Sequence, residues 1–302
     1  MAKKFFKRHQ GRASYELFSN YNHYVPGYGG MFMLFLMFII GALLGNIVVA
    51  ALTLISPEFA TMYGTIISYP VMFIPPMLYA SANSRRNEFF ETGYALDSCN
   101  FGSLGGFRMA LAVSVLTIAT SFIADSLNGL LPPVPEWFEA VMEQLMKGPV
   151  WITLISVSVF APLFEEWLCR GLVLRGLLQK TGPATAIAVS SLFFAVLHMN
   201  PWQALPAFLL GLVFGYVYYK TGSLKLTMLM HCVNNTMAVI FSKIPSLAEA
   251  DSFMEVMNPW AYAGIIVACV AYLAATMVVL RNIPFSKEGA RSNCDEIPPM
   301  TI

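Results

Sequence analysis

The sequence predicts an all-α polytopic membrane protein, with about eight transmembrane helices around a polar cavity inside the membrane. Of its 302 residues, 57% are hydrophobic and only 12% are charged, a composition far from that of soluble domains. Several apolar stretches approach the roughly 20 residues that an α-helix needs to cross a bilayer. None shows the short alternating strands of an outer-membrane barrel. A few ionisable residues nevertheless fall inside these stretches, which is costly and typical of functional sites.

The apolar stretches follow one another along the chain with short polar connections. We place them at 31–56, 60–81, 107–131, 148–180, 184–199, 204–220, 223–242 and 259–281. The domain boundaries follow: a basic N-terminal segment at 1–30, N-terminal helices and loops at 31–147, motif-bearing helices at 148–242, an outer loop with the last helix at 243–281, and a polar tail at 282–302.

The ends of the chain differ from the apolar stretches in composition. Residues 1–30 begin with a basic and aromatic run that shows no small-residue cleavage site, so we interpret it as a cytoplasmic anchor or a short interfacial helix and not as a signal peptide. The polar tail at 282–302 contains Pro298-Pro299, and we expect it to be mostly disordered.

The loop charges give the expected orientation, because cytoplasmic loops are enriched in Lys and Arg. With the N-terminus inside, the outer loops hold only Lys147 and Lys243 as basic residues and are otherwise acidic. We therefore expect both termini in the cytoplasm. The lack of a recognisable eukaryotic targeting signal favours a bacterial inner (plasma) membrane. The outer loop before residue 148 also contains an amphipathic segment around Trp137, which we place on the outer membrane interface.

The net charge is +1 and there is no long basic tract. Nucleic-acid binding depends on clustered Lys and Arg that neutralise phosphates. We therefore expect no nucleic-acid partner, and membrane lipid as the surroundings of the protein.

The fourth apolar stretch contains two adjacent carboxylates, Glu165 and Glu166, followed by Arg170. Residues four apart face each other on a helix, so Arg170 can neutralise Glu166. Glu165 would then be free for proton transfer.

Two histidines also fall in apolar helices. His198 ends the fifth stretch, and His231 lies one helical turn before Asn235 in the seventh. Glu165 and His198 are at nearly equal sequence distances from the turn at 181–183, so an antiparallel hairpin would place them at one height, roughly 25 Å from the turn. His231 lies at the same height if the hairpin around residues 181–183 projects further into the cytoplasm than the turn at residue 222, which precedes His231. This geometry predicts a site below the membrane mid-plane that opens inward.

The ordered motifs EExxxR, FxxxH and HxxxN on successive helices resemble the CAAX protease and bacteriocin-processing family of intramembrane endopeptidases. The resemblance covers roughly residues 150–240. It implies that Glu165 is the general base on a water that His198 helps to hold. It also implies that His231 and Asn235 stabilise the oxyanion. Glu166 and Arg170 would organise the first helix, and Phe194 would pack.

Each of these residues also has a purely structural interpretation. Glu166 and Arg170 could form only a buried ion pair, and a histidine inside a membrane is often a satisfied interhelical hydrogen-bonding group. Two histidines and two carboxylates could also hold zinc with an open position. There is no HExxH helix, however, and the resemblance implies that Glu165 and His198 activate the water themselves. We expect no catalytic cofactor, with zinc as the alternative.

The leading hypothesis is an intramembrane endopeptidase that hydrolyses a peptide bond near the cytoplasmic face. The substrate would be a peptide or membrane protein, possibly lipidated, because the resembled family includes enzymes that trim prenylated proteins and relatives linked to bacteriocin maturation or immunity. The alternative is a noncatalytic membrane scaffold or bacteriocin-immunity protein that uses the same cavity for binding. A transporter fits less well, because the paired broken helices of many transporters are absent.

Overall fold

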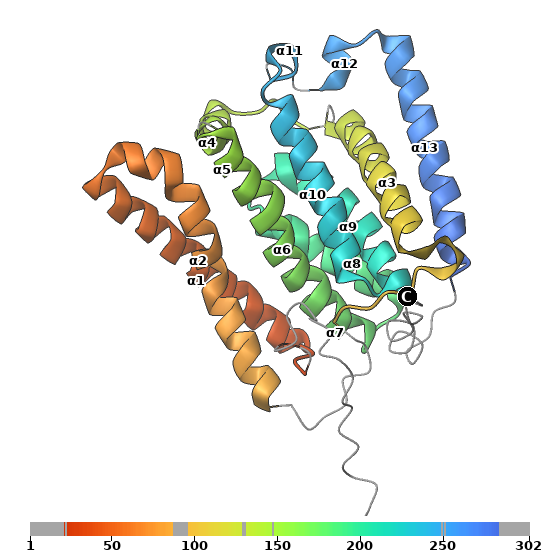
Figure 1. Cartoon of the computed structure of the whole chain (residues 1–302), viewed down its shortest axis with the longest axis horizontal. Helices are drawn as coiled ribbons and strands as arrows, with labels where there is room; N and C mark the ends of the chain where they lie inside the picture. The colour runs from red at the N-terminus through yellow and green to blue at the C-terminus, as the bar shows by residue number, and fades with distance from the viewer. Residues whose placement is uncertain are drawn as a thin grey trace, which may run out of the picture.

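The computed structural model describes residue 21 and residues 23–86, 96–128, 131–146, 148–248, 250 and 252–283. Within this part of the chain every regular element is a helix (Figure 1). The prediction of an all-α protein is confirmed. The predicted N-terminal segment up to residue 20 and almost all of the predicted tail lie outside the described residues.

The first two helices form an antiparallel hairpin at one side of the molecule (Figure 1). Helix α1 (Tyr28–Ile55) meets α2 (Pro57–Arg86) at the single residue Ser56. The two helices approach closely at Gly41, where an added Cβ would lie 1.8 Å from the carbonyl oxygen of Met72. Small residues at such crossings let helix backbones touch inside a membrane, where packing and not the hydrophobic effect drives association.

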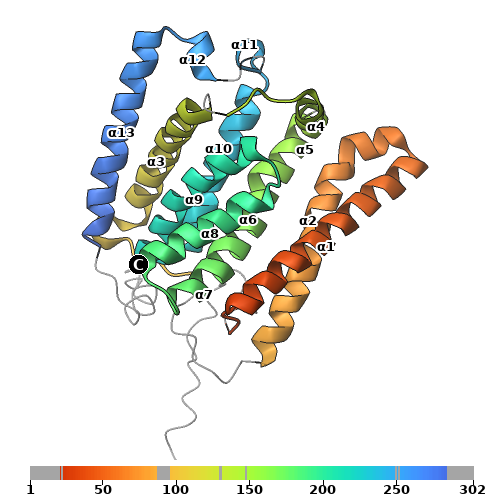
Figure 2. The same cartoon turned by 180° about the vertical axis from the view of Figure 1, so that it is seen from behind.

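The remaining long helices form the main bundle. They are α3 (Gly105–Asn128), the continuous segment 150–178, α8 (Pro183–Leu197), α9 (Pro201–Thr221), α10 (Leu224–Phe241) and α13 (Pro259–Arg281). Figure 1 shows α6 and α10 on one face of this bundle, and Figure 2 shows α8 and α9 covering the other. Four short elements occupy the loops: η2 (Gly102–Leu104), α4 (Glu136–Met146), α11 (Pro245–Ala248) and α12 (Phe253–Val256).

The segment 150–178 changes its helical winding four times. It consists of α5 (Val150–Thr153), the π-helix η3 (Leu154–Phe160), α6 (Ala161–Glu166), the π-helix η4 (Trp167–Leu174) and α7 (Arg175–Leu178). All eight residues of η4 are buried. The segment is therefore the centre of the bundle, and π-helical turns are frequent at functional sites.

Seven helices of the described residues are long and apolar enough to cross a membrane. The remaining one of the eight predicted spans is the fifth stretch, at 184–199. It corresponds to α8, which has only 15 residues. At 1.5 Å per residue it extends over about 22 Å, short of a bilayer core of about 30 Å. It ends early because the chain turns sharply at Met199, whose φ is 54°, and Pro201 then begins α9.

Charged side chains separate to the two ends of the bundle. The end with the 181–183 and 222 turns carries Arg85, Arg108, Lys180, Lys220, Lys225 and Arg281. The opposite end holds α4, α11 and α12 (Figure 1) and carries Glu58, Asp125, Glu136, Glu139, Glu143 and Glu255, with Lys243 as the single Lys or Arg among its described loop residues. We call these the basic end and the acidic end. The amphipathic segment predicted near Trp137 is the helix α4 of the acidic end.

Candidate active site

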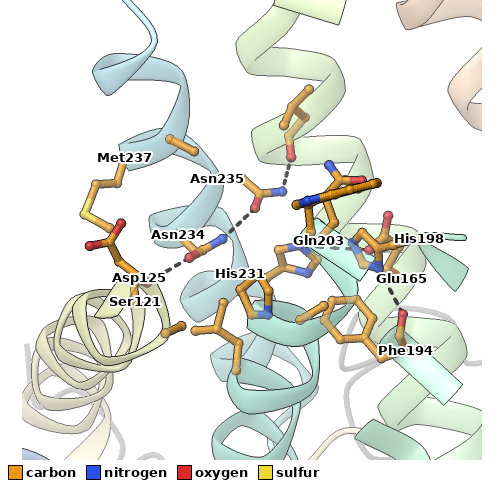
Figure 3. A pocket seen from close by; sticks show the side chains of 18 of the residues that line it. Ser121, Asp125, Glu165, Phe194, His198, Gln203, His231, Asn234, Asn235 and Met237 are labelled. Carbon is orange, nitrogen blue, oxygen red and sulfur yellow. Dashed lines mark hydrogen bonds and ion pairs between the residues drawn. The ribbon is translucent and has the colours of Figure 1, made fainter. Parts of the chain in front are cut away.

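A pocket of about 500 Å³ lies among α2, α3, α6, α8, α9 and α10. This volume is typical of sites that bind small ligands or a few residues of a peptide. Glu165, His198, His231 and Asn235 all line it, although they come from three separate parts of the motif-bearing region (Figure 3). The intramembrane polar cavity predicted from the sequence is therefore present. Glu166 and Arg170 do not line the pocket and lie directly behind it.

Glu165 lies in the short α-helix α6, between the two π-helical segments. Its Oε1 accepts a hydrogen bond from the hydroxyl of Tyr69 on α2. Its Oε2 is buried and has no hydrogen-bond partner among the described residues. Its side chain is only 14% exposed. A carboxylate oxygen without a partner in such a place can accept a proton from a water molecule, because no other donor competes for it.

Glu166 and Arg170 form the predicted ion pair, with Nη1 of Arg170 2.7 Å from Oε1 of Glu166 and both side chains 0% exposed. The guanidinium carbon of Arg170 also lies 4.5 Å from the centre of the Phe194 ring and 5.5 Å from that of Phe214. Its Nη2 donates to the carbonyl oxygen of Gly211 at 3.3 Å. The buried charges thus neutralise each other, and the aromatic rings add cation–π attraction.

His231 connects the ion pair to the pocket. Its Nδ1 lies 3.0 Å from Oε1 of Glu166, and its Nε2 lies 3.9 Å from Oε2 of Glu165. Because an ionised carboxylate only accepts hydrogen bonds, Nδ1 is the donor. Nε2 of a neutral His231 is then an acceptor, and it becomes a donor only when the ring is protonated.

His198 is fixed by the sharp turn that ends α8. Its Nδ1 lies 3.0 Å from the carbonyl oxygen of Phe194 and must donate, so the neutral ring presents Nε2 as an acceptor. The side chain of Asn200 donates to the carbonyl oxygen of His198 at 2.7 Å and also caps α9 by accepting from the backbone of Gln203. The turn residue Met199 has a positive φ of 54°, which is uncommon for residues other than glycine. This strained turn holds the ring at the pocket.

Asn235 is held by a chain of hydrogen bonds. Its Nδ2 donates to the carbonyl oxygen of Val157 in η3 at 2.7 Å, and its Oδ1 accepts from Asn234 at 3.0 Å. The Oδ1 of Asn234 accepts in turn from the hydroxyl of Ser121 on α3 at 2.8 Å (Figure 3). An amide nitrogen carries two hydrogens, so Asn235 retains one N–H beyond its bond to Val157.

Phe194 packs among the charged groups, as the sequence analysis expected. Its ring centre lies 5.1 Å from that of His198 and 5.5 Å from that of His231, both nearly edge-to-face. With Arg170 over its face, its ring contacts both histidines and the guanidinium.

Three contributors to the site were missed by the sequence analysis: Tyr69, Asn234 and Ser121. Asn234 stands beside Asn235 in a polar pair inside an apolar helix, which was an available signal. Tyr69 and Ser121 belong to helices that carry no recognisable motif, and their contacts to Glu165 and Asn234 span 96 and 113 residues. No spacing rule reaches contacts that distant in sequence.

The pocket extends from Glu165 toward the acidic end, where Asp125, Met142, Trp202 and Phe253 line it. No residue of η4 or α7 lines it within the described chain. The sequence predicted a site that opens toward the cytoplasm. This direction stays a prediction, although the lining residues extend toward the acidic end. The number of residues between each motif residue and the nearest turn indicated the height of the site along the helices. It gave no information on which end of the pocket is closed. The Glu166–Arg170 pair closes the basic side.

Metal donors do not converge in the part of the chain that the structure describes, where no group of three His, Cys, Asp or Glu side chains is placed to hold an ion. The Nδ1 atoms of His198 and His231 are engaged with Phe194 and Glu166.

Fold and site together define a polytopic helical membrane protein with a buried carboxylate and two histidines in an intramembrane pocket. Residues 147–237 match the family described as type II CAAX prenyl endopeptidase Rce1-like. The resemblance found from the motifs is thereby confirmed.

Two curated relatives agree with this assignment. The putative membrane peptidase YdiL of Bacillus subtilis is 26% identical over 151 residues, which cover 46% of this chain and 61% of the relative. The membrane-embedded CAAX protease MroQ of Staphylococcus aureus is 30% identical over 102 residues, or 32% of this chain and 40% of the relative. The chain thus spans less than two thirds of either relative. No solved structure matches it significantly.

Proposed function

We propose that the protein is an intramembrane endopeptidase that hydrolyses a peptide bond with water activated by Glu165 and His198. The observation that carries this proposal is the buried, unpartnered Oε2 of Glu165 in the pocket that His198, His231 and Asn235 also line. The family of residues 147–237 and the peptidase names of both relatives support it.

The attacking water would donate its hydrogens to Oε2 of Glu165 and Nε2 of His198, both of which are acceptors. This leaves an oxygen lone pair directed at the substrate. Glu165 takes one proton as the water oxygen adds to the carbonyl carbon, and a tetrahedral oxyanion forms. Glu165 then returns the proton to the leaving amine nitrogen as the carbon–nitrogen bond breaks. General base catalysis of this kind contributes about 10²–10⁴-fold to a rate.

The oxyanion would be stabilised by the second N–H of Asn235 and by the protonated Nε2 of His231. The hydrogen bond of Asn235 to Val157 and its link to Asn234 fix the amide before the reaction begins. Preorganised donors are effective because they need no rearrangement when charge develops. Glu166 and Arg170 act as positioning residues, since they orient and polarise the ring of His231.

The proposed reaction uses no metal. Zinc is the alternative cofactor, and it would have to draw ligands into a new arrangement.

The proposed substrate is a peptide or membrane-protein segment, possibly lipidated, in contact with membrane lipid and without a nucleic-acid partner. The host membrane is proposed to be a bacterial inner membrane, with both termini in the cytoplasm as the loop charges favour. The names of the family and of MroQ refer to CAAX substrates, but no residue of the pocket selects a prenyl group over another apolar segment.

The test is a comparison of the peptides in cells that carry the wild-type protein, Glu165→Gln, or the matched control Glu143→Gln. Glu143 is an exposed carboxylate on α4, so its replacement should leave processing unchanged. We expect Glu165→Gln to lower the formation of specific cleavage products by about 10²–10⁴-fold at equal protein level. The purified enzyme should keep its activity on such a product's precursor after exhaustive chelation.

The alternative function is a noncatalytic scaffold or immunity protein that binds a partner in the same pocket. A folded Glu165→Gln protein that retains the full cellular phenotype and an unchanged peptide profile would favour binding and overturn the hydrolytic proposal. Loss of activity on chelation, with restoration by zinc alone, would replace the metal-free mechanism by a zinc-dependent one.

A further inference from the structure

The described part of the bundle has a strong charge polarity that bears on its orientation. Its exposed Arg and Lys side chains gather at the basic end, and Asp97 at that end is paired with Lys225 at 2.8 Å. Because cytoplasmic loops of membrane proteins are enriched in Lys and Arg, the basic end faces the cytoplasm. The acidic end, with α4, α11 and α12, then faces the opposite side of the membrane (Figure 1).

The pocket runs from the catalytic groups to this acidic end. Its far wall is formed by the last turns of α3 and α10, the first turn of α9, and the short helices α4 and α12. Asp125 holds this rim together, because its Oδ2 accepts from the hydroxyls of Ser252 and Tyr262 at 2.9 and 2.8 Å. These bonds link α3 to α12 and α13, so the rim is a built structure and not a gap between loose loops.

Aromatic side chains next to the rim indicate where the membrane surface lies. The ring centre of Trp202 lies 6.0 Å from that of Trp137 and 5.4 Å from that of Phe138 on α4, and its Nε1 donates to the carbonyl oxygen of Pro132 at 2.9 Å. Trp137 is 60% exposed. Tryptophan favours the interface between lipid and water, where its ring is apolar and its N–H is satisfied. The rim is thus at the surface of the membrane.

The other side of the catalytic groups is closed. Glu166 and Arg170 are 0% exposed, and the rings of Phe194 and Phe214 cover the guanidinium. Below them Trp167, Leu168 and Leu172 are also fully buried. A substrate from the basic end would have to break this buried ion pair, which is strongly unfavourable because it leaves an uncompensated buried charge.

We propose that the pocket takes its substrate from the extracytoplasmic side of the membrane. The substrate class is a polypeptide segment exposed on that side, such as the extracytoplasmic part of an exported or membrane-anchored peptide. That the bound polypeptide is a substrate rests on the proposed function. The direction of access rests only on the charge polarity, the rim, and the side that the Glu166–Arg170 pair closes.

Cysteine labelling tests the direction of access without requiring catalysis. Three single cysteines are introduced into a variant without the five native cysteines: Glu143→Cys on the surface of the acidic end, Ala238→Cys in the pocket, and Gly182→Cys at the basic end. Gly182 has φ −65°, and nothing lies within 4 Å of an added Cβ, so this change is tolerated. Folding is checked by gel filtration in detergent.

A small membrane-impermeant maleimide added to intact bacterial cells should label Glu143→Cys and Ala238→Cys. It should label Gly182→Cys at least tenfold less until the membrane is permeabilised. Labelling of Gly182→Cys alone would reverse the orientation and overturn the proposal. Labelling of Glu143→Cys from outside, with Ala238→Cys reached only from inside, would overturn it by showing that the pocket opens the other way.

The same labelling is repeated with Glu165→Gln, which should not change it. Expected labelling combined with unchanged peptide profiles would refute the endopeptidase while keeping the outward pocket. Reversed labelling combined with the loss of cleavage products in Glu165→Gln would keep the endopeptidase and refute outward access.

Discussion

At the scale of single residues, Glu165 and Glu166 are neighbours in sequence with different surroundings. Glu166 is neutralised by Arg170, a relation that follows from their i, i+4 spacing and could be predicted. Glu165 instead accepts a hydrogen bond from Tyr69, which lies 96 residues away in the sequence. This contact could not be predicted from spacing. Local periodicity encodes contacts along one helix, whereas contacts between helices depend on how the helices pack. Glu165 lies outside the Glu166–Arg170 ion pair, as the spacing predicted, because this relation depends only on the local contact.

Tyr69 provides a test at this scale. Tyr69→Phe removes the hydroxyl that donates to Oε1 of Glu165 and keeps the ring that stacks on Phe73. A hydrogen bond to a charged group contributes about 1.5–3 kcal/mol to stability, so we expect a lower melting temperature. Because the variant also leaves Oε1 of Glu165 without its donor, we expect the rate of peptide cleavage to fall by about tenfold or more. The matched control is Tyr63→Phe on the same helix, which should retain the wild-type rate. Equal rates for the two variants would remove Tyr69 from the site.

At the scale of elements, the long helices were predicted because their apolar runs match the thickness of a bilayer. The short helix α8 and the π-helical turns η3 and η4 were not. Hydropathy does not distinguish an α-helix from a π-helix, and it counts the residues of a sharp turn such as Met199 as part of a span. These departures concern the site directly, because η3 offers the carbonyl oxygen of Val157 to Asn235, and the turn fixes His198.

The pairing of α1 with α2 provides the second test, since α2 carries Tyr69. Gly41→Ala would place a Cβ 1.8 Å from the carbonyl oxygen of Met72, so the two helices must separate. Overpacking of this kind costs about 1–3 kcal/mol. We expect a lower melting temperature in detergent and a reduced cleavage rate. Gly64→Ala lies at the same helix pair but meets Val49 at an ordinary 3.6 Å, and it should behave as the wild type.

At the scale of the whole molecule, the sequence allowed the class of fold and the group of motif residues to be predicted, but not the direction of the pocket. The levels of Glu165, His198 and His231 are set by distances along helices, which can be counted. The open side depends on the contact of α3 with α12 through Asp125 and on α4, which also lines the pocket. None of these three elements carries a motif.

The direction of the pocket has a consequence that is independent of the membrane. Ala238 lines the pocket on α10, one turn beyond Asn234 and on the way to the acidic end. A tryptophan there would obstruct a polypeptide that arrives from that end without touching Glu165 or His231. We expect Ala238→Trp to lower the cleavage of a long polypeptide substrate at least tenfold in detergent, where both ends are accessible. Ile240→Trp is the control, because Ile240 is 54% exposed on the same helix and does not line the pocket. If Ala238→Trp cleaves as fast as Ile240→Trp, the substrate does not use the acidic end, whichever way the protein faces in its membrane.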